Sequence, residues 1–259
     1  MVTKRTWLTG CSRGLGLAML QQLLRDPEME VWGFSRTRPE VEHARFFWQE
    51  ADLAAPGVGF TVPEAACTAK SQEGNPLQAV YLINNAGWIG EIRHVGQLTS
   101  AGIAALFQLN TTAPLQLMNQ FLALYGQDEN LKRVILNISS GAALKAIDGW
   151  SAYSASKAAL NRYSETVALE AAHRNSSLRC FSVAPGVVDT EMQADIRRAP
   201  ADEFRNLEKF TQLKSSGQLW TPERSASRCL DLLFHPEAFS ETLVDVRAEN
   251  WPIASEQRP

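Results

Sequence analysis

Cysteine is scarce in this sequence, and its spacing excludes several kinds of site. The 259 residues contain four cysteines, which lie far apart and form no C-x-x-C pair. No group of cysteines and histidines has the spacing of metal ligands, so we predict no metal site. Lys4 and Arg5 have no apolar run behind them, so a secretory signal peptide is not expected. Scattered cysteines without such a signal favour the reducing cytoplasm.

An excess of one charge and long apolar runs are missing as well. The formal net charge is −3, and the lack of a basic excess argues against nucleic acid as a partner. The longest stretch without Asp, Glu, Lys or Arg, residues 94–127, contains Pro114 and several Asn and Gln side chains. A membrane-spanning helix seldom carries these residues, so we expect buried helices and no membrane partner.

What the sequence does contain is an alternation of short apolar runs with longer helical patterns. The predicted strands are Thr6–Thr9, Glu30–Ser35, Phe46–Glu50, Ala79–Ile83, Arg133–Ile138, Arg179–Val183 and Thr242–Val246. The predicted helices are Gly14–Arg25, Val62–Ser71, Thr99–Tyr125, Ala152–Arg174 and Pro222–Phe234. This alternation predicts a parallel sheet covered on both faces. We therefore expect an α/β fold, with one Rossmann-type, doubly wound sheet of about seven strands in a single domain covering residues 1–259.

Residues 187–220 break this alternation. The segment is helical in pattern, rich in charge, and lies between two strands whose connection is normally short. Long insertions at strand ends often cover a substrate, so we predict a lid segment on the substrate side. A solvated helical excursion fits the pattern equally well.

A glycine-rich loop joins the first predicted strand to the first predicted helix. It reads Gly10-Cys11-Ser12-Arg13-Gly14-Leu15-Gly16. Glycine lets the backbone approach a pyrophosphate closely, and the N–H groups at the helix start then face the anion. The spacing differs from the standard G-x-G-x-x-G fingerprint, and an ordinary tight turn is the alternative. The position between a strand and a helix favours a dinucleotide site.

The end of the second strand indicates which dinucleotide is bound. A NAD-binding domain places Asp or Glu there for the adenosine ribose, but this sequence has Ser35-Arg36-Thr37-Arg38. The Arg36 guanidinium, together with Arg13 in the glycine loop, suits a 2′-phosphate. If only one of the two arginines were present, an exposed side chain without a ligand would be the favoured interpretation. With the acid missing, the pair favours NADPH/NADP+ as the cofactor.

A tyrosine and a lysine stand one helical turn apart in Tyr153-Ser154-Ala155-Ser156-Lys157. A nearby ammonium favours a phenolate, which predicts a lowered pKa for Tyr153 and proton exchange near neutral pH. Ser140 follows the preceding strand and Asn84–Gly87 follows an earlier one, so both are expected at the ligand crevice. A surface Tyr–Lys pair and an ordinary turn at Asn84–Gly87 are the alternatives.

These motifs, in this order and spacing, resemble the short-chain dehydrogenase/reductase family over nearly the whole chain. The resemblance rests on Thr9–Gly16, Asn84–Gly87, Ser140, Tyr153, Lys157 and Pro185-Gly186. It implies a nicotinamide-dependent oxidoreductase in which Tyr153 is the general acid/base and Ser140 orients the carbonyl. It further implies that Lys157 binds the ribose and modifies the pKa of Tyr153, and that Asn110 holds a proton-relay water.

The resemblance also extends the set of expected cofactor contacts. Asp52-Leu53 matches the family's adenine contact, and residues 185–190 match its nicotinamide-side loop. The expected cofactor-binding residues are Gly10, Ser12, Arg13, Gly14, Leu15, Gly16, Arg36, Asp52, Leu53, Asn85, Ala86, Gly87, Tyr153, Lys157, Pro185, Gly186, Val188 and Thr190.

Within the family, residues 137–143, 184–193 and 213–222 are similar to the branch that contains sepiapterin reductase and the (S)-benzoin-forming benzil reductases. This implies NADPH-dependent reduction of a ketone or 1,2-diketone to the hydroxy compound, with Tyr153 as the proton donor. A non-catalytic NADPH-binding regulator would be indicated by a damaged Ser, Tyr or Lys, and a lyase or epimerase by a longer chain. Sepiapterin-type pterin reduction is a further alternative, in which Asp245 anchors a basic amine instead of being an exposed acid.

The side chains expected around the crevice favour an apolar, aromatic carbonyl compound as the substrate. The expected substrate contacts are Trp88, Ala142, Leu144, Trp150 and Met192, with Ile89, Ile147, Ile196, Phe204 and Phe210 nearby. Packing of the domain core is the alternative for half of these residues. The uncharged stretch and the helix at residues 152–174 also favour a homodimer.

Overall fold

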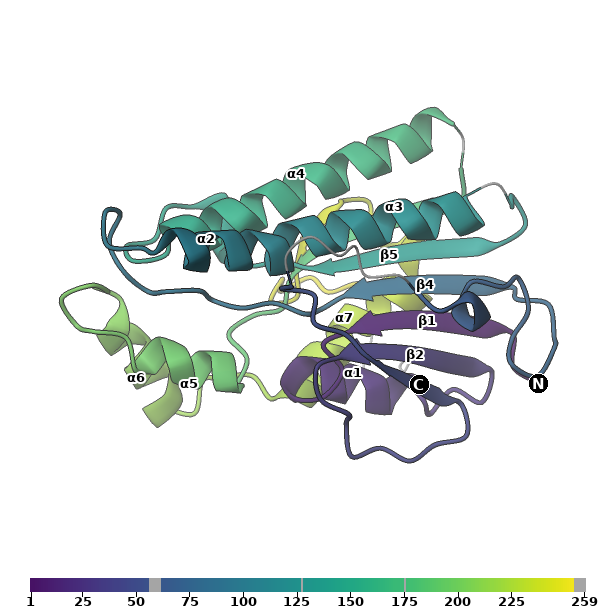
Figure 1. The fold of residues 1–259 in the computed structure, drawn as a ribbon, viewed down its shortest axis with the longest axis horizontal. Helices are drawn as coiled ribbons and strands as arrows, with labels where there is room; N and C mark the ends of the chain where they lie inside the picture. The colour runs from purple at the N-terminus through teal and green to yellow at the C-terminus, as the bar shows by residue number, and fades with distance from the viewer. Residues whose placement is uncertain (56–61, 127, 175, 254–259) are drawn as a thin grey trace.

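The computed structural model describes residues 1–55, 62–126, 128–174 and 176–253. Its strands form one parallel sheet in the order β3-β2-β1-β4-β5-β6-β7 (Figure 1). The strands are β1 (Lys4–Thr9), β2 (Met29–Ser35), β3 (Phe46–Glu50), β4 (Ala79–Asn84), β5 (Lys132–Ile138), β6 (Leu178–Ala184) and β7 (Leu243–Asp245). The expected seven-stranded parallel sheet is confirmed, and strand ends differ from the predicted ones by one or two residues.

Helices cover both faces of the sheet. They are α1 (Gly14–Leu23) and α7 (Pro222–Phe234) on one face, and α3 (Ala113–Tyr125) and α4 (Ser151–His173) on the other (Figure 1). Successive side chains of a strand point to opposite faces. Thus Leu8 lies in the core beneath α1 and α7, whereas the neighbouring Trp7 packs edge-on against Phe121 and Tyr125 of α3. The continuous apolar strands are explained by burial on both sides.

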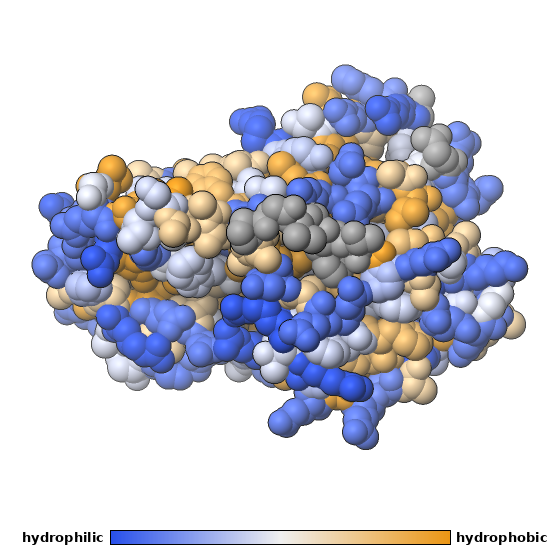
Figure 2. Space-filling model, in the orientation of Figure 1, coloured by the Kyte–Doolittle hydropathy of each residue, from blue (hydrophilic) through white to orange (hydrophobic). Residues whose placement is uncertain are grey.

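The predicted helix at residues 99–125 is interrupted near its middle. It consists of α2 (Ser100–Phe107), a wider π turn over Gln108–Thr112, and α3. Pro114 has no N–H to donate to the carbonyl of Asn110, so the regular ladder cannot continue past that residue. Figure 2 shows apolar and hydrophilic side chains mixed over this face of the molecule. In the described part of the chain, none of the helices is both long and apolar enough to cross a membrane.

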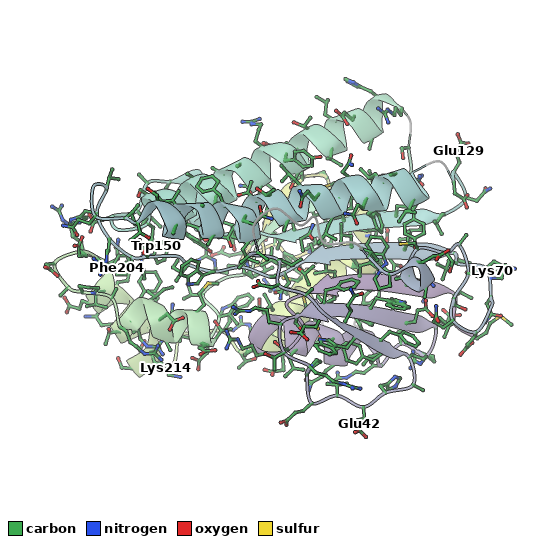
Figure 3. All side chains as sticks on the ribbon, viewed as in Figure 1. Glu42, Lys70, Glu129, Trp150, Phe204 and Lys214 are labelled. Atoms are coloured by element: carbon green, nitrogen blue, oxygen red, sulfur yellow. The ribbon has the colours of Figure 1, made fainter. Side chains whose placement is uncertain are left out.

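Residues 187–220 contain two short helices, α5 (Glu191–Arg197) and α6 (Leu207–Ser215). We call this stretch the α5–α6 segment; it lies at one end of the molecule, beyond the carboxyl ends of the strands (Figure 1). Phe204, between the two helices, is fully buried and lies beside Trp150 at the start of α4 (Figure 3). The segment is thus packed against the rest of the chain by its aromatic side chains.

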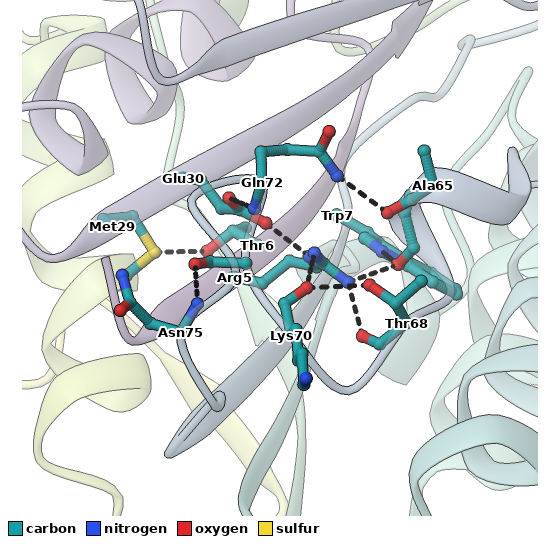
Figure 4. Close-up of polar contacts among 12 residues, drawn as sticks. Arg5, Thr6, Trp7, Met29, Glu30, Ala65, Thr68, Lys70, Gln72 and Asn75 are labelled. Carbon is teal, nitrogen blue, oxygen red and sulfur yellow. Dashed lines mark hydrogen bonds and ion pairs between the residues drawn. The ribbon is translucent and has the colours of Figure 1, made fainter. Parts of the chain in front are cut away.

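The opposite end of the sheet is held together by a buried ion pair. Arg5 of β1 and Glu30 of β2 are 0% and 1% exposed, and Nε donates to the Glu30 carboxylate over 2.6 Å. The remaining guanidinium N–H groups donate to the carbonyls of Ala66, Thr68 and Lys70 (Figure 4). The pair therefore fastens the loop before β4 to strands β1 and β2.

This network also corrects one prediction, since the helix expected over Val62–Ser71 is wrong. Only a short 3₁₀ turn forms, at Glu64–Ala66. A helix would direct the carbonyls of this stretch to N–H groups four residues further along the chain. Here three of them accept hydrogen bonds from Arg5 instead, and a buried guanidinium is costly unless its donors are satisfied.

Glu30→Gln is expected to destabilise the fold strongly, because it keeps the side-chain shape but leaves Arg5 buried without a counter-charge. Removing one partner of a buried pair costs about 3–5 kcal/mol, and urea denaturation measures that loss as a lower free energy of unfolding. Lys214→Gln is the control: Lys214 pairs with Asp189 at a half-exposed site, where a pair contributes about 0–1 kcal/mol. Similar losses in the two variants would contradict the prediction.

Candidate active site

The site begins where β1 and β4 lie side by side. The chain runs from β1 to β2 on one side, and later returns with β4 on the other, so the loops that follow β1 and β4 diverge at their carboxyl ends. The Thr9 hydroxyl accepts the backbone N–H groups of Asn85 (2.9 Å) and Ala86 (3.0 Å). The Asn85 side chain donates to the carbonyls of Thr9 (3.1 Å) and Gly10 (3.0 Å). The two loops are therefore one unit, in which Thr9 is a positioning residue that sequence reasoning treated only as a strand end.

The glycine loop forms a cradle that side chains would fill. Gly10 and Gly14 have φ values of 66° and 53°, which side chains rarely tolerate. A Cβ at Gly16 would lie 2.1 Å from the Gly10 carbonyl oxygen. No side chain caps the start of α1, and its first turn contains no acid. Uncapped N–H groups beside a glycine cradle fit the phosphates of a dinucleotide cofactor.

The two arginines expected at a 2′-phosphate are both at the surface. Arg36 is exposed directly after Ser35, the last residue of β2. Arg13 forms an ion pair with Glu191 at the start of α5, and both side chains are more than half exposed. The sequence did not indicate this partner. An exposed ion pair contributes about 0–1 kcal/mol, so Arg13 can exchange Glu191 for a phosphate at little cost.

Several other expected cofactor residues have buried side chains. Leu15, Leu53 and Val188 are each less than 9% exposed. The Asp52 carboxylate accepts the N–H of Ala54 and shapes the turn after β3. Ser12 is partly buried in the glycine loop.

The loop after β6 comes close to the glycine loop. Gly186 has a φ of 82°, and the Pro185 carbonyl accepts a hydrogen bond from Ser225. The methyl group of Thr190 would lie 3.1 Å from a Cβ at Gly14. The structure thus brings Thr190 against the glycine loop after β1.

The expected catalytic side chains Tyr153 and Lys157 lie on one buried face of α4. Tyr153 is 7% and Lys157 4% exposed. Burial raises the pKa of Tyr153, and a hydrogen bond with the Ser140 hydroxyl acts in the opposite direction. Ser140 also accepts the N–H of Ala142, which fixes its side chain at the start of a short 3₁₀ turn. The structure therefore places the Ser140 hydroxyl against Tyr153.

Lys157 does not act on Tyr153 as the sequence suggested. Its ammonium donates to the carbonyl of Ile138 over 2.8 Å, and burial lowers its pKa to about 8. The pKa of Tyr153 is raised by burial, instead of being lowered by the lysine. The expectation of a lowered tyrosine pKa is therefore not met in this structure, because desolvation outweighs the nearby donors.

Asn110, in the π turn, is fully buried and holds the loop after β4. Its amide nitrogen donates to the Trp88 carbonyl (2.8 Å), while its oxygen accepts the Trp88 N–H (2.9 Å). The same nitrogen donates to Ser156 of α4, which sequence reasoning did not identify. A Cβ at Gly87 would lie 3.5 Å from the Asn110 oxygen and 3.4 Å from the Lys157 ammonium. Glycine at this position thus leaves space beside both side chains.

Apolar side chains from four parts of the chain gather against Tyr153. Trp150 contacts the Tyr153 ring edge-on, with ring centroids 5.7 Å apart, and stacks on Phe204 at 5.3 Å. The cluster also contains the predicted side chains Ile89, Ala142, Ile147, Met192, Ile196 and Phe210. Trp88, which is 37% exposed, and Leu144, which is 71% exposed, do not belong to it. Most of the side chains predicted to contact the substrate thus form one cluster around Tyr153.

Asp245, the candidate anchor for a basic amine, already has a partner. Its carboxylate accepts two hydrogen bonds from the Arg247 guanidinium and one from the Arg247 backbone N–H. Burial acts against its charged form, but these bonds hold the pKa of Asp245 below its ordinary value. The sequence gave no sign that this acid would be engaged two residues further along the chain.

Comparison with known proteins agrees with this geometry. The short chain dehydrogenase family model matches residues 4–201. The chain is 34% identical over 226 residues to a benzil reductase ((S)-benzoin forming) from Bacillus subtilis, covering 87% of this chain and 91% of that protein. It is 32% identical over 254 residues to the sepiapterin reductase of Bos taurus, covering 92% of each. A short chain dehydrogenase/reductase structure from Saccharomyces cerevisiae shares the fold, with a TM-score of 0.81 and 24% identity over 99% of this chain and 100% of that one.

Lys157→Met tests the burial of the lysine in the cofactor-free chain. Its pKa is about 8 in the folded protein and 10.5 in its ordinary state, so the unfolded chain binds the proton more tightly. Between these values unfolding takes up a proton, and stability rises with pH. We expect the free energy of unfolding of the parent to increase, relative to the variant, as pH rises above about 8.

Urea denaturation at a series of pH values from about 7 to about 9.5 measures this difference. Lys209→Met replaces an exposed lysine of α6 and is the control. Its free energy of unfolding should change with pH in the same way as that of the parent. A parent-to-variant difference that does not change with pH would show that Lys157 is not desolvated.

Proposed function

The chain belongs to the short-chain dehydrogenase family of oxidoreductases, and from this premise we propose that it uses NADPH to reduce an aromatic ketone or 1,2-diketone to the hydroxy compound. The observation that carries the proposal is the apolar, aromatic cluster packed against Tyr153 and closed by Phe204. Ligand sites are mostly apolar, with a few placed polar groups that orient the ligand, so these side chains beside Ser140 and Tyr153 suit an aromatic substrate. The benzil reductase name of one relative agrees with a substrate of this class.

The residues of the site have complementary roles in such a reduction. A bound nicotinamide cofactor supplies the hydride. Ser140 and Tyr153 donate hydrogen bonds to the carbonyl oxygen, where negative charge develops. The raised pKa of Tyr153 keeps its proton on the phenol at neutral pH, where it is available for transfer to the substrate oxygen. Lys157, whose pKa is about 8, is protonated at neutral pH and can resupply that proton through water near Asn110.

The preference for NADPH is supported by the charge around the glycine loop. Arg36 follows β2 where a NAD-binding domain has an acid, and Arg13 is held there only by an exposed ion pair. Two guanidinium groups match a 2′-phosphate and have no comparable partner on a 2′-hydroxyl. The remaining cofactor contacts come from the glycine cradle, Asn85–Gly87 and the loop at residues 185–190.

The α5–α6 segment is proposed to cover the substrate. Phe204 lies on the indole of Trp150, and the neighbouring Glu203 is contacted by His94. The His94 ring lies 3.1 Å from the Asp148 carboxylate and 3.3 Å from that of Glu203. The segment is therefore fastened to the loops before α2 and α4, so that it closes the apolar cluster from outside.

Pterin reduction is the second candidate, supported by the similarity to sepiapterin reductase. The acid required to bind a basic pterin amine would be Asp245. Because Arg247 occupies both carboxylate oxygens of Asp245, we favour the aromatic carbonyl compound. A non-catalytic role is disfavoured because Ser140, Tyr153 and Lys157 are all present, and the Ser140 hydroxyl is hydrogen-bonded to Tyr153.

A homodimer and a cytoplasmic location complete the proposal. Helix α4 exposes Leu169, which is 56% accessible, beside a hollow of about 470 Å³ between α4 and β6. Such an apolar helix face is suited to a second copy of the chain. The four cysteines are unpaired, as expected in a reducing compartment.

The experiment that tests the function is NADPH consumption with a panel of carbonyl compounds. Benzil, isatin, menadione, sepiapterin and simple aliphatic ketones cover the competing substrate classes. We expect benzil to be reduced with a higher kcat/KM than the aliphatic ketones and sepiapterin. A strong preference for a charged substrate over every aromatic carbonyl compound would overturn the proposal.

Tyr153→Phe is expected to lower kcat by about a hundredfold or more, because it removes the proton that the carbonyl oxygen receives. NADPH binding, followed by fluorescence titration, should stay nearly unchanged since the glycine cradle and Lys157 remain. Tyr163→Phe, on the same helix, is the control and should retain full turnover. Turnover of Tyr153→Phe within tenfold of the parent would show that another group supplies the proton.

Arg36→Ala is expected to weaken NADPH binding without affecting NADH. Loss of a charged hydrogen-bonded contact removes about 1.5–3 kcal/mol, or roughly ten- to a hundredfold in affinity. Arg38→Ala, an exposed neighbour, is the matched control. Equal catalytic efficiency of the parent with NADPH and NADH would refute the cofactor assignment.

A further inference from the structure

One polar atom in the aromatic cluster has no partner. The indole Nε1 of Trp150 is buried, and no hydrogen-bond acceptor lies within reach of it among the described residues. Trp150 as a whole is only 6% exposed. Buried donors nearly always have an acceptor in folded proteins. A donor that loses its hydrogen bond to water on folding and gains no other destabilises the protein. A phenylalanine would supply an aromatic ring here without this penalty.

The position of this ring ties it to the reaction. Trp150 immediately precedes α4 and lies one turn before Tyr153, whose ring it contacts edge-on. Phe204 stacks on the indole at an interplanar angle of 14°, and Phe210 lies against it at 5.4 Å. The unpaired N–H therefore belongs to a side chain that lies between the proton donor and the α5–α6 segment (Figure 3).

Among the described residues, none accepts a hydrogen bond from this N–H, and its neighbours in the cluster are apolar. The other members of the cluster are aliphatic and aromatic side chains, apart from the Tyr153 hydroxyl, which is paired with Ser140. Helix α6, which carries Phe210, contains no fully buried residue, so this phenyl ring can move aside at low cost. A ligand oxygen that reached the indole edge would therefore satisfy this donor.

We propose that the Trp150 indole N–H donates a hydrogen bond to the second oxygen of a 1,2-dicarbonyl substrate. This rests on the proposed carbonyl reduction: one oxygen lies at Ser140 and Tyr153, and the neighbouring oxygen pairs with Nε1. Trp150 is then a specificity-determining residue. It raises kcat/KM for a substrate with two adjacent carbonyl oxygens, because a substrate with one such oxygen leaves the indole N–H without an acceptor.

Two substrates and one conservative variant isolate this bond. Benzil and deoxybenzoin carry the same two phenyl rings, but deoxybenzoin lacks the second carbonyl oxygen. Trp150→Phe keeps an aromatic ring and removes the N–H. We expect the variant to lose roughly tenfold in kcat/KM for benzil and little for deoxybenzoin, as suits one hydrogen bond. For each ketone, the kcat/KM of the variant is divided by that of the parent. Comparing these two ratios removes the difference in intrinsic reactivity between benzil and deoxybenzoin.

Trp32→Phe is the matched control. The Nε1 of Trp32 is likewise buried and unpaired among the described residues, but Trp32 lies in β2 and stacks on Phe47 of β3. Its replacement removes the same atoms outside the site, so the ratio of benzil to deoxybenzoin should not change. Both variants are checked for folding by circular dichroism.

A second measurement does not depend on the activity of a variant. In parent protein with ¹⁵N-labelled indoles and NADP+ present, benzil should shift the Trp150 Nε1–H resonance downfield, whereas deoxybenzoin should not. The Trp32 resonance should stay in place with either ketone.

The outcomes separate the two proposals. The inference fails if Trp150→Phe lowers kcat/KM equally for both ketones. It also fails if the Trp150 Nε1–H resonance shifts equally with benzil and deoxybenzoin. Trp150 then serves packing only. If the parent reduces neither ketone nor any other carbonyl compound of the panel, the proposed function itself fails.

Discussion

The pairing of β1 with β4 is the constraint on which the site depends. Because β1 lies between β2 and β4, the chain leaves β1 toward one side of the sheet and approaches β4 from the other. The loops after these strands diverge and leave their backbone groups facing a common crevice. Thr9 and Asn85 then bond the two loops to each other, so that the glycine cradle is held by the sheet itself.

Burial, more than charge, determines the chemistry of the catalytic side chains. Tyr153 and Lys157 face the sheet from α4, and both lose water there. The effect on their pKa values is opposite in sign, because desolvation disfavours the phenolate and the ammonium alike. A tyrosine that keeps its proton beside a lysine that readily releases one is suited to giving a proton to a substrate. This pairing follows from the burial of the two side chains and is independent of the comparisons.

The two ends of the molecule differ in how they are held. At the amino ends of the strands, Arg5 and Glu30 are fully buried and satisfied, so that end is rigid. At the carboxyl ends, the α5–α6 segment rests on aromatic contacts, on the exposed Arg13–Glu191 ion pair and on the contacts of His94. Exposed pairs are weak, whereas buried networks are strong. The α5–α6 segment is therefore held less firmly than the amino ends of the strands.

The sequence by itself determined the sheet and the order of the motifs. Continuous apolar strands, the glycine loop and the Tyr153–Lys157 spacing are local patterns, and local patterns are readable because strand and helix periods are fixed by backbone geometry. Tertiary contacts decided the rest. Residues 62–71 have a helical pattern, but carbonyls of this stretch accept hydrogen bonds from Arg5, which is distant in sequence. Glu191 and Arg247 became partners of Arg13 and Asp245, and the Trp150 N–H lost its water, only when the chain folded. No local pattern reveals such pairings, because desolvation and charge act between residues that the fold alone brings together.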